Sequence, residues 1–232
     1  MILFDGVDIR SVADVKIEDI RVSAIEWKPV VRPRAISAGS QFVRNRAGTR
    51  TVTVTFALLQ SQKDARQAAI KAICAWAKSD SEYRIDIVAH PDHYLVGVCT
   101  EKPSPSMRQW WESKLRIVFT CIDNPFWTDV NEKSVTCGQS FTVLGDAPPL
   151  MRIVKRRTVA ASNQTYTIDE SSITFSTIPA GDMIINLNDQ TARSGNTNIM
   201  PYYAFTGRFP VPSVGFHTSA GDGIIRYRER WQ

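Results

Sequence analysis

The histidines are the first residues to consider for chemistry, because imidazole can serve both as a general base and as a metal ligand. The sequence holds three, two of them in His90-Pro91-Asp92-His93. None stands beside a Ser or Cys in a nucleophile elbow of the G-x-S-x-G type, so hydrolase chemistry has no anchor here. A metal at His90 and His93 would need further ligands, and no carboxylates or thiols cluster nearby. We therefore predict no catalytic residue and no metal site, and interpret the pair as turn histidines.

Cysteines and glycines give no cofactor signature either. The four cysteines are far apart and form no C-x-x-C pair, which argues against a zinc knuckle or a redox motif; they are Cys74, Cys99, Cys121 and Cys137. The glycines Gly215, Gly221 and Gly223 are too dispersed for a phosphate-binding loop. We predict that no cofactor is bound and that the cysteines are buried free thiols.

The Trp110-Trp111 pair is a further candidate, because flat rings can stack on sugars or anchor a protein partner. The pair precedes an expected strand of the first half of the chain. We therefore favour hydrophobic packing or a subunit contact over sugar stacking.

Composition and charge describe an ordinary folded protein of 232 residues, 43% hydrophobic, with a net charge of +5. The charge excess is densest in an N-terminal arm, at Arg32, Arg34, Arg44, Arg46 and Arg50, and at Lys155-Arg156-Arg157. No aromatic residues alternate with these arginines, so solvated or interface-facing charge is favoured over phosphate binding. The N-terminus lacks the pattern of a signal peptide, and no run of ~18 apolar residues occurs, which predicts synthesis in the cytosol and no membrane insertion.

The pattern of the first half predicts strands around one helix. Residues 51–56 alternate strictly between threonine and Val or Phe, as in a half-buried strand. Ile70, Ile73, Cys74 and Ala77 recur at helical spacing, after a possible capping box at Ser61 and Asp64. Strands are expected at 83–87, 94–98 and 115–121, and residues 32–50 are interpreted as a long loop or a protruding hairpin.

The second half predicts a β-sandwich without helices. Short strand-like runs at 166–168, 173–175 and 183–187 are separated by turn residues. Two packed antiparallel sheets are the economical way to bury such strands. The fold class is therefore mainly β, with an α+β domain over 1–131 followed by a β-sandwich domain over 132–232.

Several features, taken in order, resemble the distal tail protein family of long-tailed phages over nearly the whole length. In the first half these are Phe4-Asp5-Gly6, the arm ending in Arg46-Ala47-Gly48-Thr49-Arg50, the strand at 51–56, Ala75-Trp76-Ala77 and Asn124-Pro125-Phe126-Trp127. In the second half they are residues 181–186, Gly207-Arg208-Phe209-Pro210, Val214-Gly215 and residues 227–231. Phe216-His217 depart from the family, which has an asparagine after the late glycine.

This resemblance implies a structural component of the virion, made in the host cytoplasm and placed at the tail tip. Its N-terminal belt domain would close into a hexameric ring, and its second domain would be galectin-like or like a carbohydrate-binding module. The ring would join the tail tube protein to tip or baseplate proteins, and DNA would pass through its lumen without tight binding. Arg32, Arg34, Arg44, Arg46 and Arg50 are the candidate subunit-interface residues.

Three alternatives remain at this point. The chain could be a host-adhesion module that binds surface glycans, since a sandwich and many aromatic residues are compatible with that function. It could be a tail-tube or tube-terminator subunit. A wall-degrading hydrolase is the third alternative.

Overall fold

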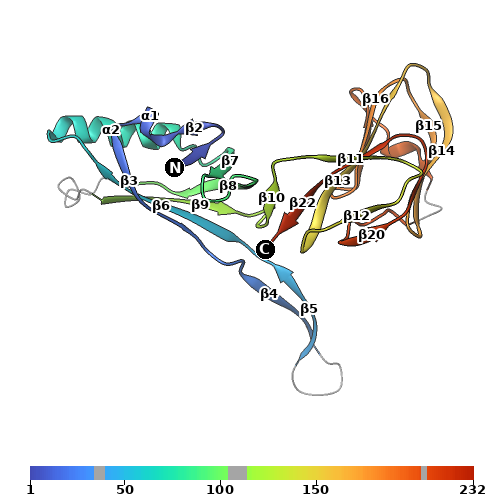
Figure 1. Cartoon of the computed structure of the whole chain (residues 1–232), viewed down its shortest axis with the longest axis horizontal. Helices are drawn as coiled ribbons and strands as arrows, with labels where there is room; N and C mark the ends of the chain where they lie inside the picture. The colour runs from blue at the N-terminus through green and yellow to red at the C-terminus, as the bar shows by residue number, and fades with distance from the viewer. Residues whose placement is uncertain (34–39, 104–113, 205–207) are drawn as a thin grey trace. The chain divides into compact units, whose positions relative to one another are not determined.

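The structure is a computed structural model that describes residues 1–33, 40–103, 114–204 and 208–232. It consists mainly of β-strands, as the sequence predicts (Figure 1). Two compact units divide between Trp127 and Thr128, with Gln232 grouped with the first, whereas the sequence places the boundary near residue 131. Each unit has a separate hydrophobic core.

One antiparallel sheet of seven strands forms the frame of the first unit, in the order β2, β1, β7, β8, β9, β6, β3. The strands are β1 (Ile2–Phe4), β2 (Val7–Asp8), β3 (Val15–Val22), β6 (Arg50–Leu58), β7 (Glu82–Ile87), β8 (His93–Glu101) and β9 (Lys114–Cys121). A short strand, β10 (Trp127–Asp129), lies where the chain passes from one unit to the next.

The core of the first unit forms because one face of this sheet is apolar and the helix α2 (Lys63–Trp76) contributes to the same core. Val52, Val54 and Phe56 are fully buried, while the threonines between them are half-buried, which confirms the predicted alternation of β6. Ile70 and Ile73 of α2 are buried in this core, and Figure 1 shows α2 beside the sheet.

The start of α2 differs from the predicted capping box. Gln62 is the N-cap residue, and its side chain makes no capping hydrogen bond. The helix therefore depends on burial of its apolar side more than on capping. Asp8 does cap the short helix α1 (Ile9–Val12), by accepting a hydrogen bond of 2.9 Å from the backbone N–H of Arg10. Neither described α-helix is both long and apolar enough to cross a membrane.

Four aromatic rings join the helix to the sheet. Phe119 of β9 lies 4.5 Å from the ring centroid of Phe4 and 5.6 Å from that of Tyr83. Trp76, at the end of α2, lies 5.3 Å from Phe4 in an edge-to-face arrangement. The Tyr83 hydroxyl also donates to the backbone carbonyl of Trp76 at 2.7 Å, so this cluster fixes the last turn of the helix on the sheet.

Two antiparallel sheets enclose the core of the second unit, as expected for a sandwich. The first has the order β18, β17, β16, β13, β22, β11 and the second β19, β15, β14, β21, with a small β12–β20 pair beside them. The strands are β11 (Lys133–Thr136), β12 (Phe141–Val143), β13 (Ala147–Arg157), β14 (Ala161–Ile168), β15 (Ser171–Ile178), β16 (Gly181–Asn186), β17 (Thr191–Ser194), β18 (Thr197–Asn198), β19 (Tyr203–Ala204), β20 (Gly215–His217), β21 (Ser219–Ala220) and β22 (Ile224–Trp231).

Every second side chain along these strands faces inward, and these apolar side chains fill the space between the sheets. Met183 and Ile185 of β16 and Ile173 and Phe175 of β15 are fully buried. The three strands predicted at 166–168, 173–175 and 183–187 correspond to β14, β15 and β16. The described part of this unit contains one short helical turn, the 3-10 helix η1 (Met200–Tyr202).

The cysteines are all free, and Cys99 and Cys121 are buried as predicted, whereas Cys74 and Cys137 are half-buried. Burial raises the pKa of the Cys121 thiol to about 11. Such a thiol stays protonated at neutral pH and behaves as a small apolar group.

Candidate functional site: an exposed hairpin and an open sheet edge

His90 lies in the turn before β8, as the sequence predicts, whereas His93 is the first residue of that strand. The His90 ring lies 4.7 Å from the ring centroid of Trp127. Within the described ranges, no three His, Cys, Asp or Glu side chains are close enough together to hold a metal ion.

The third histidine, His217, is buried, and its ring contacts two other segments of the second unit. Its Nδ1 lies 2.7 Å from a carboxylate oxygen of Asp169, and its Nε2 lies 3.0 Å from the backbone carbonyl of Ser213. Burial alone would raise the pKa of Asp169, but hydrogen bonds from His217 and Thr218 hold that pKa below its usual value. Both ring nitrogens are therefore used to tie the loop before β20 to the turn between β14 and β15.

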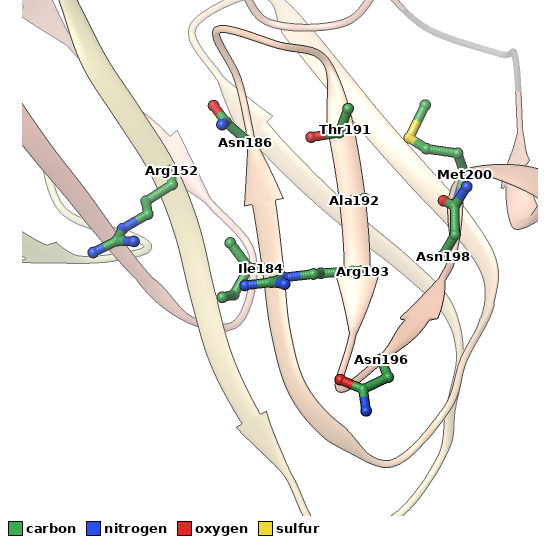
Figure 2. Close-up of a pocket in the computed structure, with 9 residues that line it drawn as sticks. All are labelled: Arg152, Ile184, Asn186, Thr191, Ala192, Arg193, Asn196, Asn198 and Met200. Carbon is green, nitrogen blue, oxygen red and sulfur yellow. The ribbon is translucent and has the colours of Figure 1, made fainter. Parts of the chain in front are cut away.

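A groove of about 540 Å³ lies on the outer face of the larger sheet of the second unit (Figure 2). Its side chains come from β13, β16, β17 and the segment after β17, and include Arg193, Asn198 and Met200. Arg152 is directed away from Arg193 in Figure 2 and donates to Glu132 at 2.9 Å. No aromatic ring lines the groove within the described residues, so it offers no stacking platform for a sugar. Trp110-Trp111 lies outside the described residues.

The N-terminal arm is a two-stranded hairpin of β4 (Trp27–Pro33) and β5 (Ser40–Ala47), one of the two forms that the sequence predicts. Figure 1 shows it extending away from β3 and β6. Among the described strands, β4 and β5 pair only with each other. Trp27 and Val31 of β4 are 44% and 52% exposed, so two large apolar side chains of one strand face solvent.

The strand register divides the hairpin into two faces. Trp27, Pro29 and Val31 alternate along β4 and so point to one side, which we call the apolar face. Lys28 pairs with Arg46, and Val30 pairs with Arg44. Paired residues point to the same side of a sheet, so Lys28, Arg32, Arg44 and Arg46 share the opposite side, which we call the basic face.

Two of the five predicted interface arginines are not placed on this hairpin. Arg50 begins β6 and is only 5% exposed, with its guanidinium 5.8 Å from the ring centroid of Trp127. Its assignment to the exposed arm was wrong, because residue 50 is in phase with the buried residues Val52 and Val54 of the same strand. Arg34 lies outside the described residues.

An open groove of about 570 Å³ runs beside β3, the last strand of the first sheet. Among the described strands, β3 pairs only with β6, so its other edge is unpaired. Ile17, Ile20 and Leu59 contribute apolar side chains to the groove, and Leu59 is 55% exposed. Glu18 and Asp19 add carboxylates there, of which Glu18 pairs with Lys114 at 3.1 Å. No local pattern of residues predicts this groove, because it depends on which strand ends the sheet.

No family model matches the sequence, and no curated protein is similar enough in sequence to match it. Solved structures do match. The Dit protein (gp 19.1) of phage SPP1, described as a paradigm of the hub of the adsorption apparatus in phages that infect Gram-positive bacteria, superposes with a TM-score of 0.75. The match covers 100% of this chain and 98% of that chain, at 14% sequence identity.

Two structures of the phage P2 baseplate in its activated conformation also match. With Ca the TM-score is 0.54 at 8% identity, over 95% of this chain and 91% of that chain. With Sr the TM-score is 0.52 at 9% identity, over 94% and 91%. The resemblance stated from the sequence is thus confirmed at the level of the fold, and this chain has the fold of a phage distal tail hub protein.

Proposed function

We propose that this chain is a non-catalytic hub subunit of a phage tail tip, where it joins the tail tube to the tip or baseplate proteins. The observation that supports this most directly is the full-length similarity to the SPP1 Dit hub protein, which extends through both units. A match of one unit alone would support only a shared module. Similarity across the whole chain favours a shared architecture and a shared place in the virion.

The proposed subunit contact is made by the β4–β5 hairpin. Its apolar face exposes Trp27 and Val31, and the groove beside β3 exposes Leu59 next to the half-buried Ile17 and Ile20. Both surfaces belong to the first unit and are separate from each other. We propose that the hairpin of one copy lies in the β3 groove of the next copy, where each surface buries the other.

A contact between two different surfaces is head-to-tail, and such contacts close into a ring when the rotation between neighbours divides a full turn. Closure also covers the unpaired edge of β3, which would otherwise be a template for aggregation. We propose a hexamer on the basis of the family resemblance. In this assembly DNA passes through the lumen, and the chain presents its remaining surfaces to the tube and to the tip.

The oligomeric state provides the direct test. Size-exclusion chromatography with light scattering should give six times the 26.0 kDa of one chain, and negative-stain images should show rings. The double variant Trp27→Ser, Val31→Ser should be monomeric because it removes the apolar face. Val211→Ser, at a residue 65% exposed in the second unit, is the matched control and should keep the ring. A wild-type chain that stays monomeric at every concentration up to ~100 µM would overturn the proposal.

Cross-linking then tests the pairing of the two surfaces. Chains carrying Val31→Cys and chains carrying Leu59→Cys should form a covalent dimer when mixed and oxidised, while neither should do so alone. Mixing Val31→Cys with Val211→Cys is the control and should give no dimer. Equal cross-linking of both mixtures would show that the hairpin does not select the β3 groove.

A further inference from the structure

The charge on the hairpin is concentrated on one side. Lys28, Arg32, Arg44 and Arg46 lie on the basic face and are all exposed, and β4 and β5 contain no Asp or Glu. Among the residues that the structure describes, Lys28 alone of these four cations has an acidic neighbour, Glu26, with a separation of 3.7 Å between the two exposed side chains. Within the described part of the chain, no ion pair or hydrogen bond engages the side chains of the three arginines. In the sequence the positive charges are spread along the arm, whereas the pairing of β4 with β5 places them on one face of the hairpin.

Four cations on one side of a ribbon repel one another, and like charges on directly opposite residues of paired strands are destabilising. Lys28 and Arg46 are such a pair. A surface of this kind is best compensated by an extended polyanion, which can meet all four cations at once. Same-face residues recur every ~6.6 Å along a strand, so the cations form a linear array rather than a pocket.

We propose that the basic face of the hairpin contacts the phosphate backbone of double-stranded DNA, weakly and without reading its sequence, while the apolar face lies on the neighbouring copy. This inference rests on the proposed ring function, because the ring places one face of each hairpin against a neighbour and leaves the other free. Guanidinium groups bind phosphate oxygens readily, and arginines without protein partners are free to do so.

The opposite face supports the division of roles. Trp27, Pro29 and Val31 form an exposed, uncharged surface that suits burial in a subunit contact, where charged residues are depleted. Burying the four cations there instead would require desolvating them against a groove with only two carboxylates, both of which already have partners: Glu18 pairs with Lys114 and Asp19 with Arg21. The arginines therefore remain more favourably placed outside the contact.

The experiment measures DNA binding and ring mass on the same samples. A fluorescently labelled 20-base-pair duplex is titrated with the full chain at several salt concentrations, and anisotropy gives the affinity. Arg44→Gln, Arg46→Gln should weaken binding on the order of tenfold near 0.2 M salt and by more at 0.05 M, because the salt slope becomes smaller by about 1.8, with about 0.9 from each lost phosphate contact. The same variant should keep the ring mass. Lys71→Gln, Lys78→Gln removes the same charge from exposed positions elsewhere in the first unit and should leave both readings unchanged.

The remaining outcomes each decide the question. Loss of the ring in Arg44→Gln, Arg46→Gln would mean that the arginines are subunit contacts, and unchanged DNA affinity in that variant would mean that the face does not meet DNA. Competition by polyglutamate as effective as that by unlabelled duplex would indicate an acidic protein partner, and each of these results overturns the proposal. Failure of the wild-type chain to form rings counts against the proposed function alone, because the variant and the charge control can still be compared for DNA binding as monomers.

Discussion

Replacement of Phe119 by leucine tests whether the aromatic cluster holds the first unit together independently of the second. The side chain is fully buried and contacts the rings of Phe4, Tyr83 and Trp76. Each aromatic pair contributes about 0.5–1.5 kcal/mol beyond burial, and leucine leaves part of the space unfilled. We expect the free energy of unfolding of the first unit to fall by about 2 kcal/mol. A domain with about 5–15 kcal/mol of stability remains folded after such a loss.

Urea unfolding followed by tryptophan fluorescence suits this test, because Trp76 lies inside the cluster and five of the six tryptophans precede residue 128. Hydrogen exchange read peptide by peptide then assigns each transition to a unit. Phe119→Leu should move only the first unit's transition, and Phe175→Leu, in the other core, should move only the second unit's.

Phe216→Leu is the matched control. Phe216 is 67% exposed, so the same chemical change there should alter stability by less than about 0.5 kcal/mol. The reasoning is refuted if Phe119→Leu costs no more than this control, or if both core variants shift one common transition by the same amount.

Cys121, Tyr166 and Asp169 are each suited to a further test. Because burial raises the pKa of Cys121 to about 11, a thiol-specific disulfide reagent at pH 8 should leave Cys121 unmodified in the native chain and modify all four cysteines in denaturant. Tyr166 is fully buried and its hydroxyl accepts a hydrogen bond of 2.7 Å from Arg157, so Tyr166→Phe should cost about 1–2 kcal/mol in urea unfolding, whereas Tyr202→Phe, at an exposed residue, should cost little. The lowered pKa of Asp169 means that its carboxylate stabilises the fold above its usual pKa of 3.8 and loses that effect as the pH falls through the lowered value, so Asp169→Asn should be less stable than wild type at pH 7 and should converge with it in acid.

Much of the fold could be predicted because it depends on local periodicity. The alternation at 51–56 and the helical spacing around Ile70 and Ile73 both correspond to observed elements. The predicted capping box was wrong, because a Ser and an Asp at the right spacing do not by themselves determine where a helix begins. The helix begins at Lys63, with Gln62 as its N-cap residue. The helix is stabilised by the packing of Ile70 and Ile73 in the core, and its first turn has no side-chain cap.

The candidate site was harder to predict from the sequence, because it depends on the register in which β4 and β5 pair. From sequence, Arg44, Arg46 and Arg50 belong to one arginine-rich arm. Sorting Arg44 and Arg46 onto one face requires the pairing of β4 with β5 and the bulge between Val30 and Val31. Arg50, by contrast, could have been recognised, because extending the alternation of Val52 and Val54 back by two residues predicts that it is buried. The groove beside β3 had no local signal, as sheet order is set by contacts between distant segments.

The hairpin also has features that protect an unassembled copy against aggregation through its exposed strands. Pro29 supplies no N–H to an incoming strand, and the bulge interrupts the ladder, so the ribbon is a poor template for further strands. Repulsion between the cations of two such ribbons opposes stacking of like on like. In the proposed assembly, a newly made chain keeps its arm extended until it meets the β3 groove of another copy, and the formation of fibres before that step is disfavoured.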